Sequence, residues 1–170
     1  MRKGFTLVEI LIVIVVVGIL TSMMTISMSA SKISADASNI VTRLRNAKTA
    51  AMAMYVQYLD TWEGNVNDAQ KSFDMAEVRK FLNNDRNYDD NYVLVKEKKD
   101  DVYARIHWYV AYNLGDDNAR LAEKLAGRAE YDDLFGNENV LNNDDTYNDG
   151  LPNNKKTFLS NHKAVLLRVK

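Results

Sequence analysis

The sequence predicts an α+β protein in which one long N-terminal helix packs on a small antiparallel β-sheet. Residues Ile10 to Leu20 are ten apolar residues and one glycine. From Ile33 to Tyr58, apolar residues recur every three or four positions, which is the period of a helix. From Val102 to Leu114 they alternate with other residues, as in a strand with one buried face. A length of 170 residues fits one domain, and the absence of cysteine excludes a disulfide framework.

The first half of the helix is membrane material. Between Gly4 and Ser31 the only ionisable side chain is Glu9. Residues 5–31 would form about 40 Å of helix, enough to cross a hydrocarbon core of about 30 Å. Hydroxyl side chains become frequent after Thr21, so we expect the buried part to end near Met28.

The second half, residues 32–63, is expected to be amphipathic. One face carries Ile33, Ala37, Ile40, Leu44, Ala47, Ala51, Met54 and Tyr58, which a globular head would cover. No proline interrupts residues 5–63, so a single unbroken helix is expected, with Gly64 as its stop.

The opposite face of this half is basic. It carries Arg43, Arg45 and Lys48 beside small residues such as Ala50. Residues 1–59 hold six Lys or Arg against two acids, whereas residues 60–170 hold sixteen against twenty-one. We therefore expect either a solvated face or a contact with acidic heads of neighbouring subunits.

The head, residues 64–170, is expected to mix short helices with strands. Asp74 and Glu77 predict the cap of a short helix. Residues 92–97 and 102–114 predict a hairpin with one apolar face and one mixed, exposed face that includes Tyr109. A helix is predicted over 118–129 with Asp116 or Asp117 as its cap, and a second hairpin over 157–169.

The N-terminal segment has three interpretations. Arg2 and Lys3 followed by an apolar run fit a secretory signal peptide, cleaved near Ser29, but this leaves Glu9 unexplained. A plain membrane anchor would place Glu9 in the first helical turn, where the helix dipole favours a carboxylate. The third interpretation takes the residues together: a basic leader ending in Gly4, then Phe5-Thr6-Leu7-Val8-Glu9 and an apolar run.

That pattern resembles the type III signal of the type IV pilin superfamily over roughly the first 30 residues. The resemblance implies a leader of residues 1–4, cleavage between Gly4 and Phe5 by a prepilin peptidase, and N-methylation of Phe5. It implies a pilin-like fold and a structural subunit that polymerises through its N-terminal helix. A pseudopilin of a type II secretion system, and a membrane-anchored or secreted binding domain, are the alternatives.

Glu9 carries the assembly role in this resemblance. An intramembrane carboxylate costs free energy unless it is paired or protonated. In the superfamily the partner is the Phe5 amine of a neighbouring subunit; pairing within one chain is the alternative. The implied partners are further copies of the chain, other pilins, the prepilin peptidase, an inner-membrane assembly platform and membrane lipid.

The resemblance also implies a location. The subunit would span the inner membrane once, with its head outside, before it enters an extracellular pilus or a periplasmic pseudopilus. Adhesion, motility, DNA uptake and secretion all stay open as roles.

Residues 131–154 form an acidic, asparagine-rich segment that we expect to be a loop. It has five Asp, one Glu and seven Asn, and its length is unusual for a connection. Asp144, Asp145, Asn148 and Asp149 resemble half of an EF-hand loop, but Lys156 stands where the bidentate Glu belongs. We expect no cofactor, with a Ca²⁺ site of another kind as the alternative. Packing of Leu134, Phe135, Val140 and Leu141 could also hold the segment.

Enzymatic activity and nucleic-acid binding are not expected. His107 and His162 have no partners at catalytic or metal-ligand spacing, and no phosphate loop occurs. The acidic balance of the head disfavours contacts to nucleic-acid phosphates.

Overall fold

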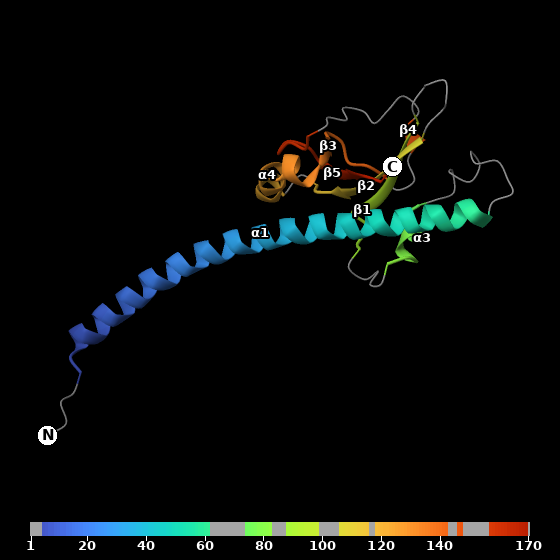
Figure 1. Ribbon diagram of the computed structural model, residues 1–170. Helices are drawn as coiled ribbons and strands as arrows, with labels where there is room; N and C mark the ends of the chain where they lie inside the picture. The colour runs from blue at the N-terminus through green and yellow to red at the C-terminus, as the bar shows by residue number, and fades with distance from the viewer. Residues whose placement is uncertain are drawn as a thin grey trace.

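The computed structural model describes residues 5–61, 74–82, 88–98, 106–115, 118–142, 146–147 and 157–169. It shows one long helix whose second half carries the head, while the first half extends away from it (Figure 1). The element order is α1, α3, β1, β2, α4, α5, β3, β4 and β5. A long N-terminal helix followed by a small, mainly antiparallel sheet is a pilin-like α+β layout, as the sequence predicts.

Helix α1 runs without interruption from Leu7 to Thr61, 55 residues, or about 82 Å at about 1.5 Å per residue. It curves gently along its length (Figure 1). The buried positions of its second half follow the predicted stripe: Ala37, Ile40, Val41, Leu44, Ala47, Ala50, Ala51 and Met54. Ala50 belongs to this buried face, so its assignment to the basic face was wrong. The predicted stop at Gly64 lies outside the described residues.

The head is built on a five-stranded sheet in the order β3-β5-β2-β1-β4. Strands β1 (Tyr92–Lys98) and β2 (Ile106–Asn113) form the predicted antiparallel pair, with Leu94 opposite Val110. Strand β5 (Ala164–Arg168) pairs antiparallel with β2 and with β3 (Phe135–Asn137). The two-residue strand β4 (Thr146–Tyr147) lies parallel to β1.

Both faces of the sheet are buried. Tyr92, Leu94, Trp108, Val110 and Val165 join the core with α1, and Trp108 meets Tyr55 edge-on at 5.6 Å. On the other face, Val93, Tyr109, Ala111 and Leu166 surround Leu141, and all five side chains are buried. The prediction of an exposed second face with Tyr109 was therefore wrong.

The segment that ends at Leu141 covers this second face because a side chain of β2 holds it there. The Asn113 amide donates to the Leu141 carbonyl at 2.7 Å, and the Leu141 N–H donates to Asn113 Oδ1 at 3.0 Å. One asparagine thus satisfies both backbone groups of Leu141, as a neighbouring strand would. Of the four apolar residues expected to hold the segment, Leu134 and Leu141 are buried, Phe135 is half-buried and Val140 is exposed.

Short helices complete the head. The Asp74 carboxylate accepts from the Glu77 N–H at 3.0 Å at the start of α3 (Met75–Arg79), as predicted. The predicted helix over 118–129 divides into α4 (Ala119–Ala126) and α5 (Ala129–Asp132). Asn118 occupies the first cap position, and its side chain donates to the Leu114 carbonyl at 2.6 Å. Because the end of α5 and all of β3 lie inside residues 131–154, the first part of that segment is not the loop we expected.

The C-terminal segment corrects another expectation. A second hairpin was predicted over 157–169, and residues 160–161 do form a turn, but residues 157–159 are not a strand, so there is no second hairpin there. Phe158 instead inserts its fully buried ring into the core. Its N–H donates to the Leu134 carbonyl at 2.9 Å, which fastens this segment to the end of α5.

Candidate functional site

The first half of α1 exposes its apolar side chains on every side. Residues Ile10 to Leu20 keep about half or more of each large apolar side chain exposed, and Phe5 is 84% exposed. The most apolar 18-residue window of the helix has a mean hydropathy of 2.7, and none of it is buried. A helix that is apolar all round belongs in a membrane or a protein core. By length and composition α1 can cross a membrane.

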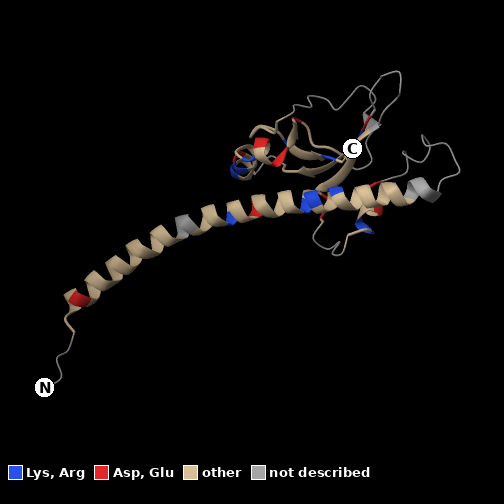
Figure 2. Ribbon diagram, in the orientation of Figure 1, with Lys and Arg blue, Asp and Glu red and all other residues tan. Residues whose placement is uncertain are grey.

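Figure 2 shows how charge divides along the chain: one acidic position near the start of α1, then mixed charges in its second half and the head. That acidic position is Glu9, in the first turn of α1. Its neighbours are among the exposed apolar residues, so the carboxylate lies at the beginning of the segment that would enter the membrane.

Glu9 closes a capping box with Thr6. Its Oε2 accepts from the Thr6 N–H and from the Thr6 hydroxyl, both at 2.7 Å. The Glu9 N–H in turn donates to Thr6 Oγ1 at 3.3 Å. Two N–H groups that the helix leaves without partners are satisfied in this way. Within the described part of the chain Glu9 Oε1 accepts no hydrogen bond, so one carboxylate oxygen is left for another partner.

The processing residues lie just before this box. Phe5 is described and exposed, one residue before the N-terminal cap, while Gly4 lies outside the described residues. Cleavage between them, methylation of Phe5 and pairing of Glu9 stay predictions.

Residues 1–25 match the family model of the prokaryotic N-terminal methylation motif. This is the signal of type IV pilin-like and pseudopilin substrates of prepilin peptidase, which are structural proteins. The motif implies processing by that peptidase and assembly with pilins, and the motif and the long apolar helix are consistent with anchoring in a membrane before assembly. Neither the comparison with curated proteins nor that with solved structures gave a match.

The basic face of α1 contacts the chain's own head. Arg45 Nη2 lies 2.8 Å from Asp132 Oδ1, and Arg128 Nε lies 2.9 Å from Asp132 Oδ2. The Asp132 side chain is 1% exposed, whereas the two arginine side chains are 54% and 38% exposed. Arg45 was expected to face solvent or a neighbouring subunit; in this structure it joins α1 to α5.

Arg43 lies beside a cluster of three tyrosines. The Tyr88 hydroxyl donates to the Arg43 carbonyl at 3.2 Å. The centroid of the Tyr92 ring lies 5.0 Å from that of Tyr88 and 4.7 Å from that of Tyr112. Burial raises the pKa of all three phenols, and the charge of Arg43 opposes this effect only in part. The tyrosines therefore stay neutral at physiological pH and act as packing groups between α1 and β1.

Replacing the buried Asp132 by Asn should lower the free energy of unfolding by about 1–2 kcal/mol. Hydrogen bonds to charged groups contribute about 1.5–3 kcal/mol, but both arginines are partly hydrated and can regain water. Thermal unfolding of the full-length protein in detergent measures this. Asp133→Asn is the matched control, because Asp133 is exposed and its φ of 56° suits Asn. An equal loss in both variants would contradict a joining role for Asp132.

The candidate calcium ligands Asp144, Asp145, Asn148 and Asp149 lie outside the described residues. In the described ranges, no three His, Asp or Glu side chains are grouped as a metal site would need. Calcium binding stays a prediction. The two histidines have packing and hydrogen-bonding roles: His107 Nδ1 lies 2.7 Å from Arg168 Nη2, and His162 Nδ1 accepts from the Leu159 N–H at 3.0 Å.

The sequence analysis did not identify two features, one at the start of α1 and one in the helical segment 120–128. The Thr6-x-x-Glu9 spacing is a capping-box signature, and it was legible in the sequence. Arg120, Lys124 and Arg128 recur every four residues, which places them on one side of a helical segment. Their proximity to α1 depends on tertiary packing and could not be read from spacing.

Proposed function

We propose that the chain is a structural subunit of a type IV pilus-like filament, without enzymatic activity. Prepilin peptidase removes residues 1–4 and methylates Phe5, and the subunit polymerises through α1. The observation that carries this proposal is the match of residues 1–25 to the methylation motif, on a helix whose apolar half is exposed.

Before assembly, the subunit spans the inner membrane once with its head outside, and its partners are further copies of itself and an assembly platform. The exposed apolar half of α1 supports this proposal, because it needs either lipid or neighbouring helices to cover it. The capping box uses only Oε2 of Glu9, so Oε1 is available to a group on a neighbouring subunit.

Mass spectrometry of the mature protein from a cell that has a prepilin peptidase tests the processing step. The expected N-terminus is a methylated Phe5. A mature protein that starts near Ala30 would instead indicate a secreted domain and end the proposal.

Electron microscopy of sheared surface material tests the kind of filament. Long fibres that contain the chain are expected for a pilus subunit. Correct processing without surface fibres would favour the pseudopilin of a type II secretion system.

A further inference from the structure

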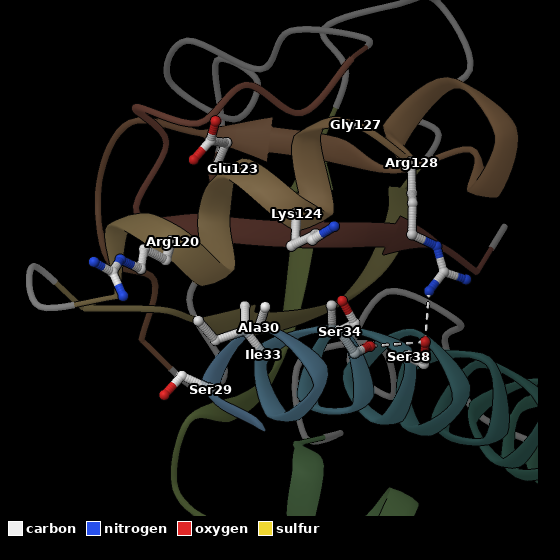
Figure 3. Close-up of a pocket in the computed structure, with 11 residues that line it drawn as sticks. Ser29, Ala30, Ile33, Ser34, Ser38, Arg120, Glu123, Lys124, Gly127 and Arg128 are labelled. Carbon is white, nitrogen blue, oxygen red and sulfur yellow. Dashed lines mark hydrogen bonds between the residues drawn. The ribbon is translucent and has the colours of Figure 1, made fainter. Parts of the chain in front are cut away.

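Helices α1 and α4 enclose an open groove at the membrane end of the head (Figure 3). Its volume is about 920 Å³. Residues of α1 form one wall, with hydroxyl groups of Ser29, Ser34 and Ser38 and the apolar Ile33. Residues 120–128, in α4 and the turn after it, form the other wall, which carries Arg120, Lys124 and Arg128.

The groove is cationic. Figure 3 shows Lys124 above Ser34 and Arg120 at the end near Ser29. Glu123 also lines the groove, so the lining carries three basic side chains and one carboxylate. Arg128 closes the other end: its Nη1 donates to Ser38 Oγ at 2.8 Å, and its Nε pairs with Asp132. Arg120 and Lys124 are exposed and pair with no group in the described ranges of the chain. Arg120 and Lys124 therefore lie beside the groove, and no protein group in the described ranges holds either side chain in place.

The position of the groove along α1 relates it to the membrane. The apolar segment is expected to end near Met28, and the groove begins at Ser29. From Ser29 to Ser38 the helix rises about 14 Å at about 1.5 Å per residue, while the headgroup layer on one side of a bilayer is about 5–7 Å thick. The Arg120 end of the groove therefore lies at headgroup level when α1 spans the membrane.

We propose that this groove binds the headgroup of an anionic phospholipid in the outer leaflet of the membrane that α1 crosses. The phosphate lies between Arg120 and Lys124, the Ser34 hydroxyl donates to one of its oxygens, and Ile33 contacts the glycerol region. This inference rests on the proposed membrane anchoring. Charge and depth favour lipid over a second copy of the chain, because the groove opens where lipid headgroups are always present.

Such a contact would hold the head against the membrane surface before assembly. A subunit that leaves the membrane for a filament must then release the lipid, so the groove would favour the membrane-bound state of the subunit over the assembled one.

The test uses the full-length protein in detergent micelles, with lipid retention measured by native mass spectrometry. The probes are phosphatidylglycerol, phosphatidylcholine and soluble glycerol phosphate. Wild-type protein is expected to retain phosphatidylglycerol in preference to phosphatidylcholine. Arg120→Gln with Lys124→Gln should reduce that preference about 25-fold at low ionic strength, since each basic residue near an anionic surface contributes about fivefold.

The control removes two exposed cations away from the groove, by Lys80→Gln with Arg168→Gln, and should keep the preference. Arg120→Lys with Lys124→Arg retains charge and should keep it too, which separates a charge effect from misfolding. An unchanged preference in the Gln variant overturns the inference. So does equal retention of glycerol phosphate, or a Gln variant that loses self-association but not lipid. A wild-type chain that does not enter micelles overturns the membrane proposal as well.

Discussion

Replacing Glu9 by Ala is expected to leave cleavage before Phe5 intact and to lower filament yield by about tenfold or more. A charged side chain at the centre of a membrane helix costs about 3 kcal/mol when it has no compensating charge, and Glu9 lies at the start of the apolar segment. Docking beside the amine of a neighbouring Phe5 supplies that charge, so the wild-type subunit gains free energy on assembly that the variant does not.

The capping box offers a competing explanation, because Glu9→Ala also removes the carboxylate that accepts from the Thr6 N–H and hydroxyl. Glu9→Gln separates the two roles. Glutamine can still close the box at this position, but it carries no charge. If pairing drives assembly, the Gln variant should fail as the Ala variant does.

Thr6→Ala is the complementary control, because it weakens the capping box without changing the charge of Glu9. It removes the hydroxyl that caps the helix but keeps the Glu9 charge, at a cost of about 1 kcal/mol to the helix. Its filament yield should stay within about twofold of wild type, while its N-terminus is processed normally. Quantitative electron microscopy of sheared material, together with mass spectrometry of Phe5, reads both steps. A Gln variant that assembles normally would assign Glu9 to capping alone.

The sequence predicted the long helix and the central hairpin because their burial patterns are local. Ala37, Leu44 and Ala51 recur at helical spacing, and every one of them is buried against the head. The alternation along β2 likewise predicted which side chains face α1. Each of these signals depends on neighbours within a few residues.

The second face of the sheet could not be predicted in this way. Tyr109 and Ala111 follow the expected alternation, but a segment 28 residues beyond Asn113 covers them. That cover depends on the paired hydrogen bonds between Asn113 and Leu141 and on the burial of the Leu141 side chain against the sheet. Similarly, Arg45 and Asp132 are 87 residues apart, so the sequence showed a basic helix face but not its partner within the same chain.

Gly136 in β3 is another position whose environment depends on a residue distant in the sequence, because His162 packs directly against it. A methyl group added at its Cα would lie 1.7 Å from His162 Nδ1 and 2.5 Å from Cε1, far inside any contact distance. The imidazole cannot move away easily, because it is 3% exposed and packs edge-on against the fully buried Phe158, with ring centroids 5.6 Å apart. Its Nδ1 also holds the Leu159 N–H at 3.0 Å.

Gly136→Ala should therefore lower the free energy of unfolding by about 3 kcal/mol or more, at the upper end of overpacking effects. Gly127→Ala is the matched control: its added carbon meets nothing closer than backbone oxygens at 3.7 Å, and its φ of −63° suits alanine. That variant should be neutral or gain up to about 1 kcal/mol. Thermal unfolding in detergent, followed by tryptophan fluorescence, compares the two.

The double variant decides the cause. In the Gly136→Ala background, His162→Ala removes the ring that the new methyl group strikes, so the second substitution should cost less there than it does in wild-type protein. Such coupling is the signature of direct contact between two positions. Additive losses would mean that Gly136 is required for its backbone in β3, beside Val165 of β5, and that His162 holds the C-terminal segment independently of it.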